Sequence, residues 1–476
     1  MENITGKECK FVIYLPPIRN YRPDTHIIKE KIHFKDGTIK KNLKIVRNFK
    51  RPFWVTKEYY RNHKEKKESE FINKLNRHTA TTEDLAKQVA ARLGNQYVGV
   101  KDLRVVRDSP YVYGLDIDGK TFIKQAYQAK YPKTTSPNDI AVLDIETDTI
   151  KDEIIVISVT MKDKIYTVIN KKLITDKYGD KSLAKLNEIY KDKLKYLYNK
   201  YIPDSDVKNI DVEYEIVKND LDCVLKAIAK LHEWEPDIAT VWNITYDINK
   251  ILDTLEKYKV NPANVFSDPN VPKEYKYFKF KLGATSSMTE SGKFKPISIE
   301  EQWHTIICPS KFYWIDAMSA HRYIRVGGKT IPGGYSLDNI LKQELGNKLG
   351  KLKFKDEKSE HLGGLEWHLY MVAERPLEYI IYNQWDTMSM IELDNKTKDL
   401  QIVLDMLLGV SNYEIFNSGP KKIVNEMHFF YQERGRILGT KPSKVSDDKG
   451  LGLDSWIKYY YFRNIVQSLH TVMYVE

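Results

Sequence analysis

Cysteine is scarce in this sequence, with three residues among 476. Cys9, Cys223 and Cys308 lie far apart, and their spacing is typical of neither a zinc site nor a disulfide framework. Scattered cysteines in odd number argue against a disulfide-stabilised secreted protein and favour a reducing compartment. Long apolar runs are missing as well, and the N-terminal "MENITGKECKF" has no apolar signal-peptide core. We therefore expect a cytoplasmic protein that does not enter a membrane.

Acidic residues are also in deficit. Lys and Arg number 76 against 65 Asp and Glu, which gives a net charge of +11. A basic excess favours a polyanionic partner such as nucleic acid, because Lys and Arg neutralise phosphates and release their counterions. The charge alone is equally compatible with a soluble basic protein that binds no polyanion. The length exceeds that of one typical hydrophobic core, so we expect two or three domains.

Residues 1–135 have the pattern of a β-rich domain with some helix. "CKFVIYL" and "IIKEKIHF" read as strands, and the turn "KDGT" predicts a hairpin. "TTEDLAKQVAARLG" predicts a helix with a Thr N-cap and a terminal Gly. "NHKEKKESE" is typical of a solvated helix face, with phosphate contact as the alternative, and "KYPKTTSPND" is typical of a linker.

From Asp139 onward strands come first and then alternate with helices. "DIAVLDIE" predicts a buried strand, and "EIIVISVTMKDKIYTVI" predicts two strands joined at Lys162 and Asp163. "PDIATVWN" predicts a further strand that ends at Asn243. "LDCVLKAIAKLHEW" predicts a helix whose buried face carries Leu221, Val224, Leu225, Ile228 and Leu231. The pattern indicates an α/β (α+β) fold with a mixed sheet flanked by helices, over residues 136–400.

Two acids stand close together in "AVLDIETDT". Side chains two positions apart on a strand point the same way, so Asp144 and Glu146 should leave one face of the predicted strand together. Two like charges beside a buried apolar run are costly unless a cation is bound. This pair therefore favours a functional site.

Two further acids lie on predicted helices. Asp247 stands near the start of a helix in "VWNITYDINKIL", and Asp386 follows Tyr382 by one helical turn in "EYIIYNQWDTMSMIEL". Alone, Asp247 reads as an N-cap, and Asp386 reads as a surface acid or a capping group. Together with Asp144 and Glu146 they could hold two Mg²⁺ (or Mn²⁺) ions that activate water for phosphodiester cleavage. Tyr382 would then orient the attacking water.

As a set, these segments carry a resemblance. "VLDIET", "WNITYD" and "YIIYNQWD", in this order, resemble the three motifs of DnaQ-like 3′–5′ exonucleases, most closely those of family B DNA polymerases of large tailed phages. "GGYSLDNIL" and "NKLGKLKF" resemble the segment before the third motif, and "LDMLLGVSNYEIFNSGPKKIVNEMHFFYQERGRIL" resembles the segment leading toward the palm. The resemblance implies an RNase H-like exonuclease domain after a β-rich N-terminal domain.

The resemblance also implies roles for single residues. It makes Asp144, Glu146, Asp247 and Asp386 the metal-binding acids and Tyr382 the water-orienting residue, in a proofreading reaction that removes 3′-terminal deoxynucleotides. It implies two divalent metal ions as cofactors and DNA, as primer-template and single-stranded 3′ end, as a partner. The residues expected to bind the substrate are Asn243, Ile145, Thr147 and Tyr246.

An insertion around residues 270–300 reads as a basic β-hairpin, in "KEYKYFKFKLGATSSMTESGKFKPISI". Family members place a DNA-contacting hairpin here, which makes DNA contact the implied role. The alternative is a basic surface segment that only packs on the domain. Tyr275, Tyr277 and Phe278 are open to both readings, as base-stacking or as core residues.

The palm motifs of such polymerases, of the D-x-x-S-L-Y-P-S and Y-x-D-T-D types, do not occur in this sequence. Residues 401–476 therefore read as a helical connector toward a missing palm. We expect a second chain with palm, fingers and thumb, a sliding clamp as a further candidate partner, and the cytoplasm of a phage-infected bacterium as the location. A truncated polymerase and a stand-alone exonuclease acting on DNA or RNA are the alternatives. From another class, a non-catalytic DNA-binding or assembly subunit is also open.

Overall fold

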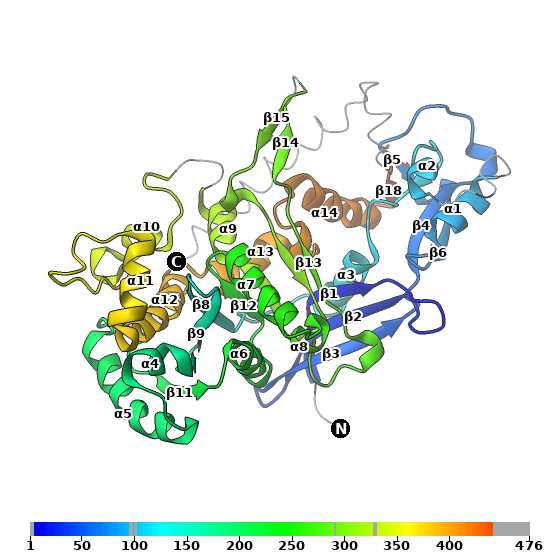
Figure 1. The fold of residues 1–476 in the computed structure, drawn as a ribbon. Coiled ribbons are helices and arrows are strands. Elements are labelled where there is room, and N and C mark those ends of the chain that lie inside the picture. The colour runs from blue at the N-terminus through cyan, green and yellow to red at the C-terminus, as the bar shows by residue number, and fades with distance from the viewer. Residues whose placement is uncertain (1–3, 95–98, 100–101, 290–291, 327–330, 441–476) are drawn as a thin grey trace. The chain divides into compact units, whose positions relative to one another are not determined.

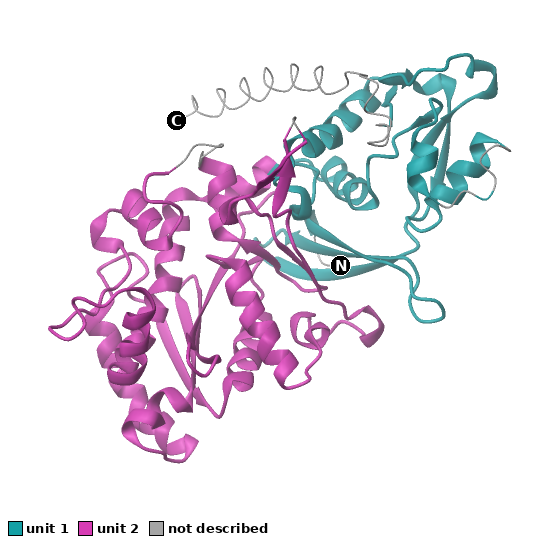
Figure 2. Ribbon diagram, turned by 45° about the horizontal axis from the view of Figure 1, so that its top comes forward, with its two compact units in different colours: residues 1–134, 408–476 teal, residues 135–407 magenta. Residues whose placement is uncertain are grey.

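The computed structural model describes residues 4–94, 99, 102–289, 292–326 and 331–440. The chain forms two compact units, one of residues 1–134 with 408–476 and one of residues 135–407 (Figure 2). The segment expected to lead toward a palm thus begins in the second unit, and from residue 408 onward it belongs to the same unit as the N-terminal residues. The part of that prediction that concerns residues 441–476 lies outside the described residues.

The first unit contains a meander of three antiparallel strands, β1 (Ile4–Leu15), β2 (Thr25–Phe34) and β3 (Ile39–Arg47). The turn between β2 and β3 contains Gly37 at a φ of +83°, where an L side chain would be strained. The hairpin predicted at "KDGT" is therefore confirmed. Helix α3 (Gly119–Lys130) covers this sheet, with Ile123 packed into the cluster of Cys9, Val12 and Ile28.

A second small sheet in this unit has the order β6 (Leu75–Ala80), β4 (Arg51–Thr56), β7 (Val112–Tyr113). It packs with α1 (Leu85–Leu93) and α2 (Leu103–Arg107). Helix α1 is the one predicted from "TTEDLAKQVAARLG", but Asp84 takes the N-cap position instead of a Thr. The remaining elements are β5 (Ser69–Phe71), its antiparallel partner β18 (Arg436–Leu438), and α14 (Gly419–Glu433).

The helix predicted for "NHKEKKESE" is wrong, because this segment has irregular backbone until β5 begins. Tertiary hydrogen bonds hold the loop instead. The Tyr111 hydroxyl donates to the carbonyls of Arg61 and His63, and Lys66 Nζ donates to the carbonyl of Ser109 at 2.9 Å. These contacts fix a non-helical path that local charge patterning does not encode.

The second unit is built on a six-stranded mixed sheet (Figure 1). In spatial order the strands are β11 (Asp211–Val217), β10 (Lys164–Asn170), β9 (Glu153–Met161), β8 (Ile140–Asp148), β12 (Ile238–Val241) and β17 (Tyr313–Asp316). Antiparallel pairs join β8 to β9 and β9 to β10, whereas parallel pairs join β10 to β11, β8 to β12 and β12 to β17. The mixed α/β architecture predicted from the sequence is confirmed.

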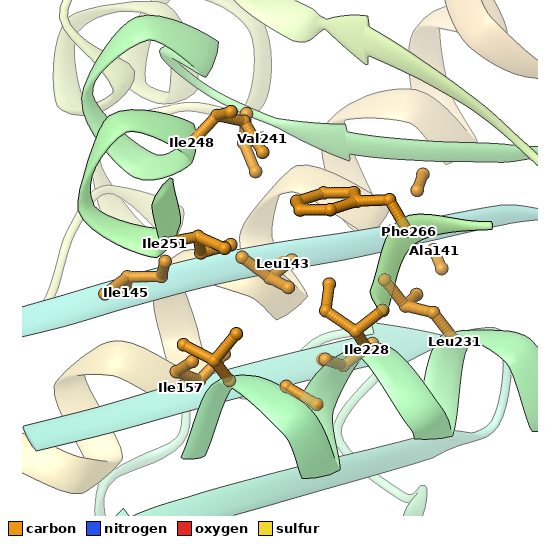
Figure 3. Close-up of a cluster of buried hydrophobic side chains, with 14 of the residues drawn as sticks. Ala141, Leu143, Ile145, Ile157, Ile228, Leu231, Val241, Ile248, Ile251 and Phe266 are labelled. Carbon is orange, nitrogen blue, oxygen red and sulfur yellow. The ribbon is translucent and has the colours of Figure 1, made fainter. Parts of the chain in front are cut away.

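The two faces of this sheet differ in chemistry. Ala141, Leu143 and Ile145 of β8 lie in an apolar cluster together with residues of α6 (Asp220–Trp234), α7 (Ile244–Lys257) and α8 (Pro262–Phe266), as Figure 3 shows. The long helix α12 (Pro376–Thr397) packs against β8 and β9 through the alternate positions, as in the hydroxyl pair Thr160–Thr387 at 2.6 Å. Strand β8 therefore separates an apolar core from a polar layer.

The helix predicted from "LDCVLKAIAKLHEW" is α6, and its apolar face is confirmed with one exception. Leu225 is 37% exposed, whereas Val224, Ile228 and Leu231 are buried. Strand β12 ends at Val241, two residues before the predicted end. The other helices of the unit are α4 (Lys171–Tyr178), α5 (Leu183–Tyr201), α9 (Ala317–His321), α10 (Leu337–Leu345), α11 (Gly364–Glu374) and, at its border, α13 (Leu404–Leu408). None of the helices in the described part of the chain is both long and apolar enough to span a membrane.

The insertion near residues 270–300 forms two successive antiparallel pairs. Strand β13 (Lys279–Lys281) pairs with β16 (Thr305–Ile307), and β14 (Ser286–Met288) pairs with β15 (Phe294–Pro296), which Figure 1 shows as a narrow ribbon. Tyr275 is 2% exposed, and Phe278 packs on Phe266 with 4.6 Å between ring centroids. These two rings therefore belong to the core and do not offer free faces for bases.

Candidate metal centre

Strand β8 places two carboxylates on its polar face. Asp144 and Glu146 point toward α12 because they alternate with Leu143 and Ile145, whose side chains fill the apolar cluster. Burial raises the pKa of Asp144 well above its usual range, and Asp386 and Glu146 add to the rise. Burial also raises the pKa of Glu146 to about 7, although a hydrogen bond from Tyr379 opposes it. The pair thus bears the electrostatic cost expected from the sequence.

Helix α12 faces this pair with four polar side chains at helical spacing. Tyr382 and Asn383 each follow Tyr379 and precede Asp386 by three or four positions, so the four share one face of the helix. The Tyr379 hydroxyl donates to Glu146 Oε2 at 2.5 Å, and Asn383 Nδ2 donates to Asp144 Oδ2 at 2.7 Å. Asp144 and Glu146 therefore each receive one hydrogen bond from α12.

Three acids come close enough to share a cation. One oxygen each from Asp144, Glu146 and Asp386 lies within 4.8 Å of the others. Carboxylate oxygens are the preferred ligands of hard divalent cations such as Mg²⁺. Asp386 is 1% exposed, so the alternative that it is a surface acid is wrong. The donor set fits a divalent metal ion.

Asp247 lies outside that close group but within its electrostatic field. Burial raises the pKa of Asp247 well above its usual range, with Glu146 and then Asp316 as further causes. The N-cap alternative for Asp247 is wrong, because Asn243 caps α7 by accepting from the backbone N–H of Thr245 at 3.2 Å. Asp316 at the end of β17 accepts from the N–H of Ile244 at 2.9 Å, which ties the start of α7 to the sheet.

Lys351 is a member of the site that was not predicted from the sequence. Its Nζ donates to Asp386 Oδ2 at 2.5 Å and to the Tyr382 hydroxyl at 2.9 Å. Burial opposes the ammonium charge, but Asp386, Tyr382 and Asp144 outweigh it and raise the pKa of Lys351. A fixed positive charge therefore stands directly beside the acids. The segment "NKLGKLKF" was singled out only for its resemblance, since its position beside Asp386 depends on the tertiary fold.

Close packing positions Lys351. The backbone N–H of Lys351 donates to Asp338 Oδ1 at 3.0 Å, and the carbonyl of Gly350 accepts from Trp385 Nε1 at 2.8 Å. A Cβ at Gly350 would lie 2.9 Å from Asp338 Oδ1, which is closer than real Cβ contacts. A larger residue here would displace the Asp338 side chain that holds the Lys351 N–H, so the small size of glycine helps to keep Lys351 in place.

An aromatic cluster adjoins the acids, and it was not predicted from the sequence either. The rings of Tyr379 and Tyr382 stack with 5.8 Å between centroids and 16° between planes, and Trp367 meets Tyr382 at 5.1 Å. His368 Nδ1 lies 2.6 Å from the Tyr379 hydroxyl and 3.8 Å from Glu146 Oε2. Burial, followed by Lys351, lowers the pKa of His368. Trp367 and His368 come from α11, which carries no pattern that separates them from ordinary core residues.

The residues expected to bind the substrate lie in different surroundings. Thr147 Oγ1 and the Tyr246 hydroxyl are 3.1 Å apart, and Tyr246 is 46% exposed. Ile145 is buried on the apolar face of β8, opposite the acids, and Asn243 serves as the cap of α7. The structure thus pairs Thr147 with Tyr246 but does not bring Ile145 to the polar face.

No protein-family model and no curated protein matches this chain. The chemistry of the site is therefore inferred from the geometry of its residues. A mixed sheet carries a group of acids beside one lysine and one tyrosine hydroxyl. Such a set of carboxylate oxygens is suited to a hard divalent cation.

Proposed function

We propose that residues 135–407 form a 3′–5′ exonuclease of the RNase H-like, DnaQ-like superfamily. The observation that carries the proposal is the approach of Asp144, Glu146 and Asp386 within 4.8 Å, together with Lys351 and Tyr382 at the same point. These three acids come from the first and third of the segments that resemble exonuclease motifs, and Asp247, from the second, lies outside the closest group. Their meeting in one site is what a common catalytic role requires.

In this proposal Asp144, Glu146 and Asp386, joined by Asp247, hold two divalent metal ions. When bound, such ions lower the pKa of an attacking water and neutralise charge on the leaving oxygen. The acids must be ionised to bind them, which reverses the protonation that burial favours in Asp144 and Glu146. Metal binding therefore releases protons from these acids and becomes stronger as the pH rises.

The other side chains act on water and phosphate. The Tyr382 oxygen accepts from Lys351 Nζ, and a hydrogen bond also joins the Tyr382 hydroxyl to Asp386. In this proposal the hydroxyl donates instead to a water or a phosphate oxygen, and so orients it, when Asp386 holds a metal ion. The ammonium of Lys351 places positive charge where a phosphodiester gains negative charge in the transition state. The products would be a deoxynucleoside monophosphate and a shortened 3′ end.

The proposal extends to the proofreading portion of a family B DNA polymerase, with the synthetic site on a second chain and a sliding clamp as a further partner. The resemblance of the three motifs supports it, and so does the ribbon of β14 and β15, where Phe294 and Met288 are 76% and 69% exposed. Preference for mismatched ends would follow from their easier fraying, because unpaired nucleotides cost less to extract.

The test is degradation of end-labelled oligonucleotides with Mg²⁺ by the full chain. The Asp144→Ala, Glu146→Ala double variant should lose activity. The matched control is Asp204→Ala, Asp206→Ala, which removes two exposed acids at the same spacing from a remote loop. Equal degradation by wild type and the Asp144, Glu146 variant would contradict the proposal.

Absence of metal-dependent cleavage, with DNA binding unchanged in that variant, would favour a non-catalytic DNA-binding subunit. Preferred cleavage of RNA would redirect the substrate class.

A further inference from the structure

We propose that Tyr379 and His368 are positioning residues that set the direction of the Glu146 carboxylate toward a bound metal ion. The inference rests on the proposed function only in taking Glu146 as a metal ligand. It gives a role to two side chains that are not among the four acids proposed to bind metal. It also links α11, which contributes no acid to the centre, to the geometry of the site.

The hydrogen-bond chain has a defined direction. The Tyr379 hydroxyl has one hydrogen, which it donates to Glu146 Oε2 at 2.5 Å. Its oxygen must then accept from His368 Nδ1, 2.6 Å away, so the neutral imidazole carries its proton on that nitrogen. The order of donation is therefore His368 to Tyr379 to Glu146. Each group fixes the orientation of the next.

Packing leaves Tyr379 little freedom. Its side chain is fully buried, its ring stacks on Tyr382, and Trp367 lies against both rings, 6.1 Å from Tyr379 between centroids. A hydroxyl on a ring that cannot turn is a rigid donor. Oε2 of Glu146 is thus held by this donor, and an oxygen of the same carboxylate lies within 4.8 Å of oxygens of Asp144 and Asp386.

A similar hydrogen bond holds the neighbouring acid, Asp144. Asn383, one helical turn after Tyr379, donates to Asp144 at 2.7 Å, so α12 provides one donor each for Asp144 and Glu146. Groups that hydrogen-bond a metal ligand from outside hold it in the binding orientation, and their loss commonly weakens metal affinity by about 10–100-fold. Tyr379 differs from Asn383 in being held in turn by His368.

The experiment measures Mn²⁺ binding to the full chain by electron paramagnetic resonance, together with kcat and KM for a single-stranded oligonucleotide. Tyr379→Phe keeps the ring stack and removes the hydroxyl, so Mn²⁺ should bind about 10-fold more weakly. His368→Phe should weaken binding too, whereas His368→Asn, which keeps a nitrogen donor near Nδ1, should restore it. Tyr370→Phe is the control, since Tyr370 on the same helix α11 donates to Asp356 at 2.9 Å away from the acids.

The expected pattern is weaker Mn²⁺ binding and a lower kcat at unchanged KM in Tyr379→Phe and His368→Phe. Wild-type Mn²⁺ affinity in Tyr379→Phe, or equal losses in Tyr370→Phe, would overturn the positioning role while leaving the nuclease proposal intact. Failure of His368→Asn to exceed His368→Phe would overturn the part assigned to His368. A wild-type chain that binds no Mn²⁺ would refute the metal centre itself. Thermal melting without metal separates these effects from misfolding.

Discussion

Lys351 Nζ lies 2.5 Å from Asp386 Oδ2 and 2.9 Å from the hydroxyl of Tyr382, four residues earlier on the same helix. One ammonium group thus joins an acid of the centre to the tyrosine proposed to orient water. The contact balances part of the negative charge that Asp144, Glu146 and Asp386 accumulate. It also makes Lys351 the most direct probe of the chemistry.

Replacing Lys351 by Met should lower kcat by about 100-fold or more, since loss of one donor to a developing oxyanion commonly has that effect. The variant also leaves Asp386 buried beside two acids without its cation, which should lower the melting temperature without metal. Steady-state kinetics and thermal melting measure the two effects. Lys353→Met, two residues away and 57% exposed, is the control and should behave as wild type. Equal rates for both variants would remove Lys351 from the mechanism.

The stability of the metal-free protein should fall as the pH rises. The pKa of Glu146 is raised from 4.5 to about 7 on folding, so the folded chain binds a proton that the unfolded chain has lost. This contribution is present below the unfolded pKa and disappears as the pH increases from about 4.5 to about 7. Melting curves in a chelator across that range should show the decline, and Glu146→Gln should flatten it. A slope of the same size in Glu146→Gln would assign the dependence to other groups.

Metal ions should stabilise the protein through the same acids. Mg²⁺ or Mn²⁺ at 100 times its Kd would add about 2.7 kcal/mol to the free energy of unfolding. The resulting rise in melting temperature should be largest near neutral pH, where the acids ionise more readily. Asp144→Asn and Asp386→Asn should abolish it, whereas Asp247→Asn should leave part of it because Asp247 lies outside the closest group. An unchanged rise in Asp386→Asn would contradict convergence on one centre.

Gly350→Ala should reduce activity although no chemical group is lost. The new Cβ would lie 2.9 Å from Asp338 Oδ1 and 3.1 Å from Lys342 Cε, so the bond from Asp338 to the Lys351 N–H must lengthen or break. We expect a several-fold lower kcat and a stability loss of about 1 kcal/mol. Gly363→Ala, where no atom lies within 4 Å of the added Cβ, is the matched control. Equal kcat in the two variants would show that Lys351 tolerates movement.

Local patterns were sufficient to predict the framework of the site. Period-two alternation placed Asp144 and Glu146 on one face of β8, and helical spacing placed Tyr382 and Asp386 one turn apart on α12. Neither prediction needed knowledge of distant contacts. The mixed sheet followed from the same patterns.

The rest depended on contacts between distant segments. Lys351 lies on a connection between α10 and α11, and nothing in its own neighbourhood distinguishes it from the lysine two positions later. His368 acquires its role only through Tyr379, which itself looks like a core aromatic of a helix. The failed helix in "NHKEKKESE" has the same cause, because Tyr111, 48 residues from His63, fixes that loop. Periodicity predicts the face of a helix or strand on which a side chain lies, but not its contacts with distant segments.

Alternate residues of strand β8 face two different surroundings. Its odd positions 143 and 145 supply the hydrophobic core with Leu143 and Ile145, and its even positions 144 and 146 supply two acids of the centre. A one-residue deletion before Asp144 would exchange the two sets and send carboxylates into the apolar cluster. A change of length in this strand would therefore disrupt the core and the acidic centre together, whereas a substitution can alter one of them alone.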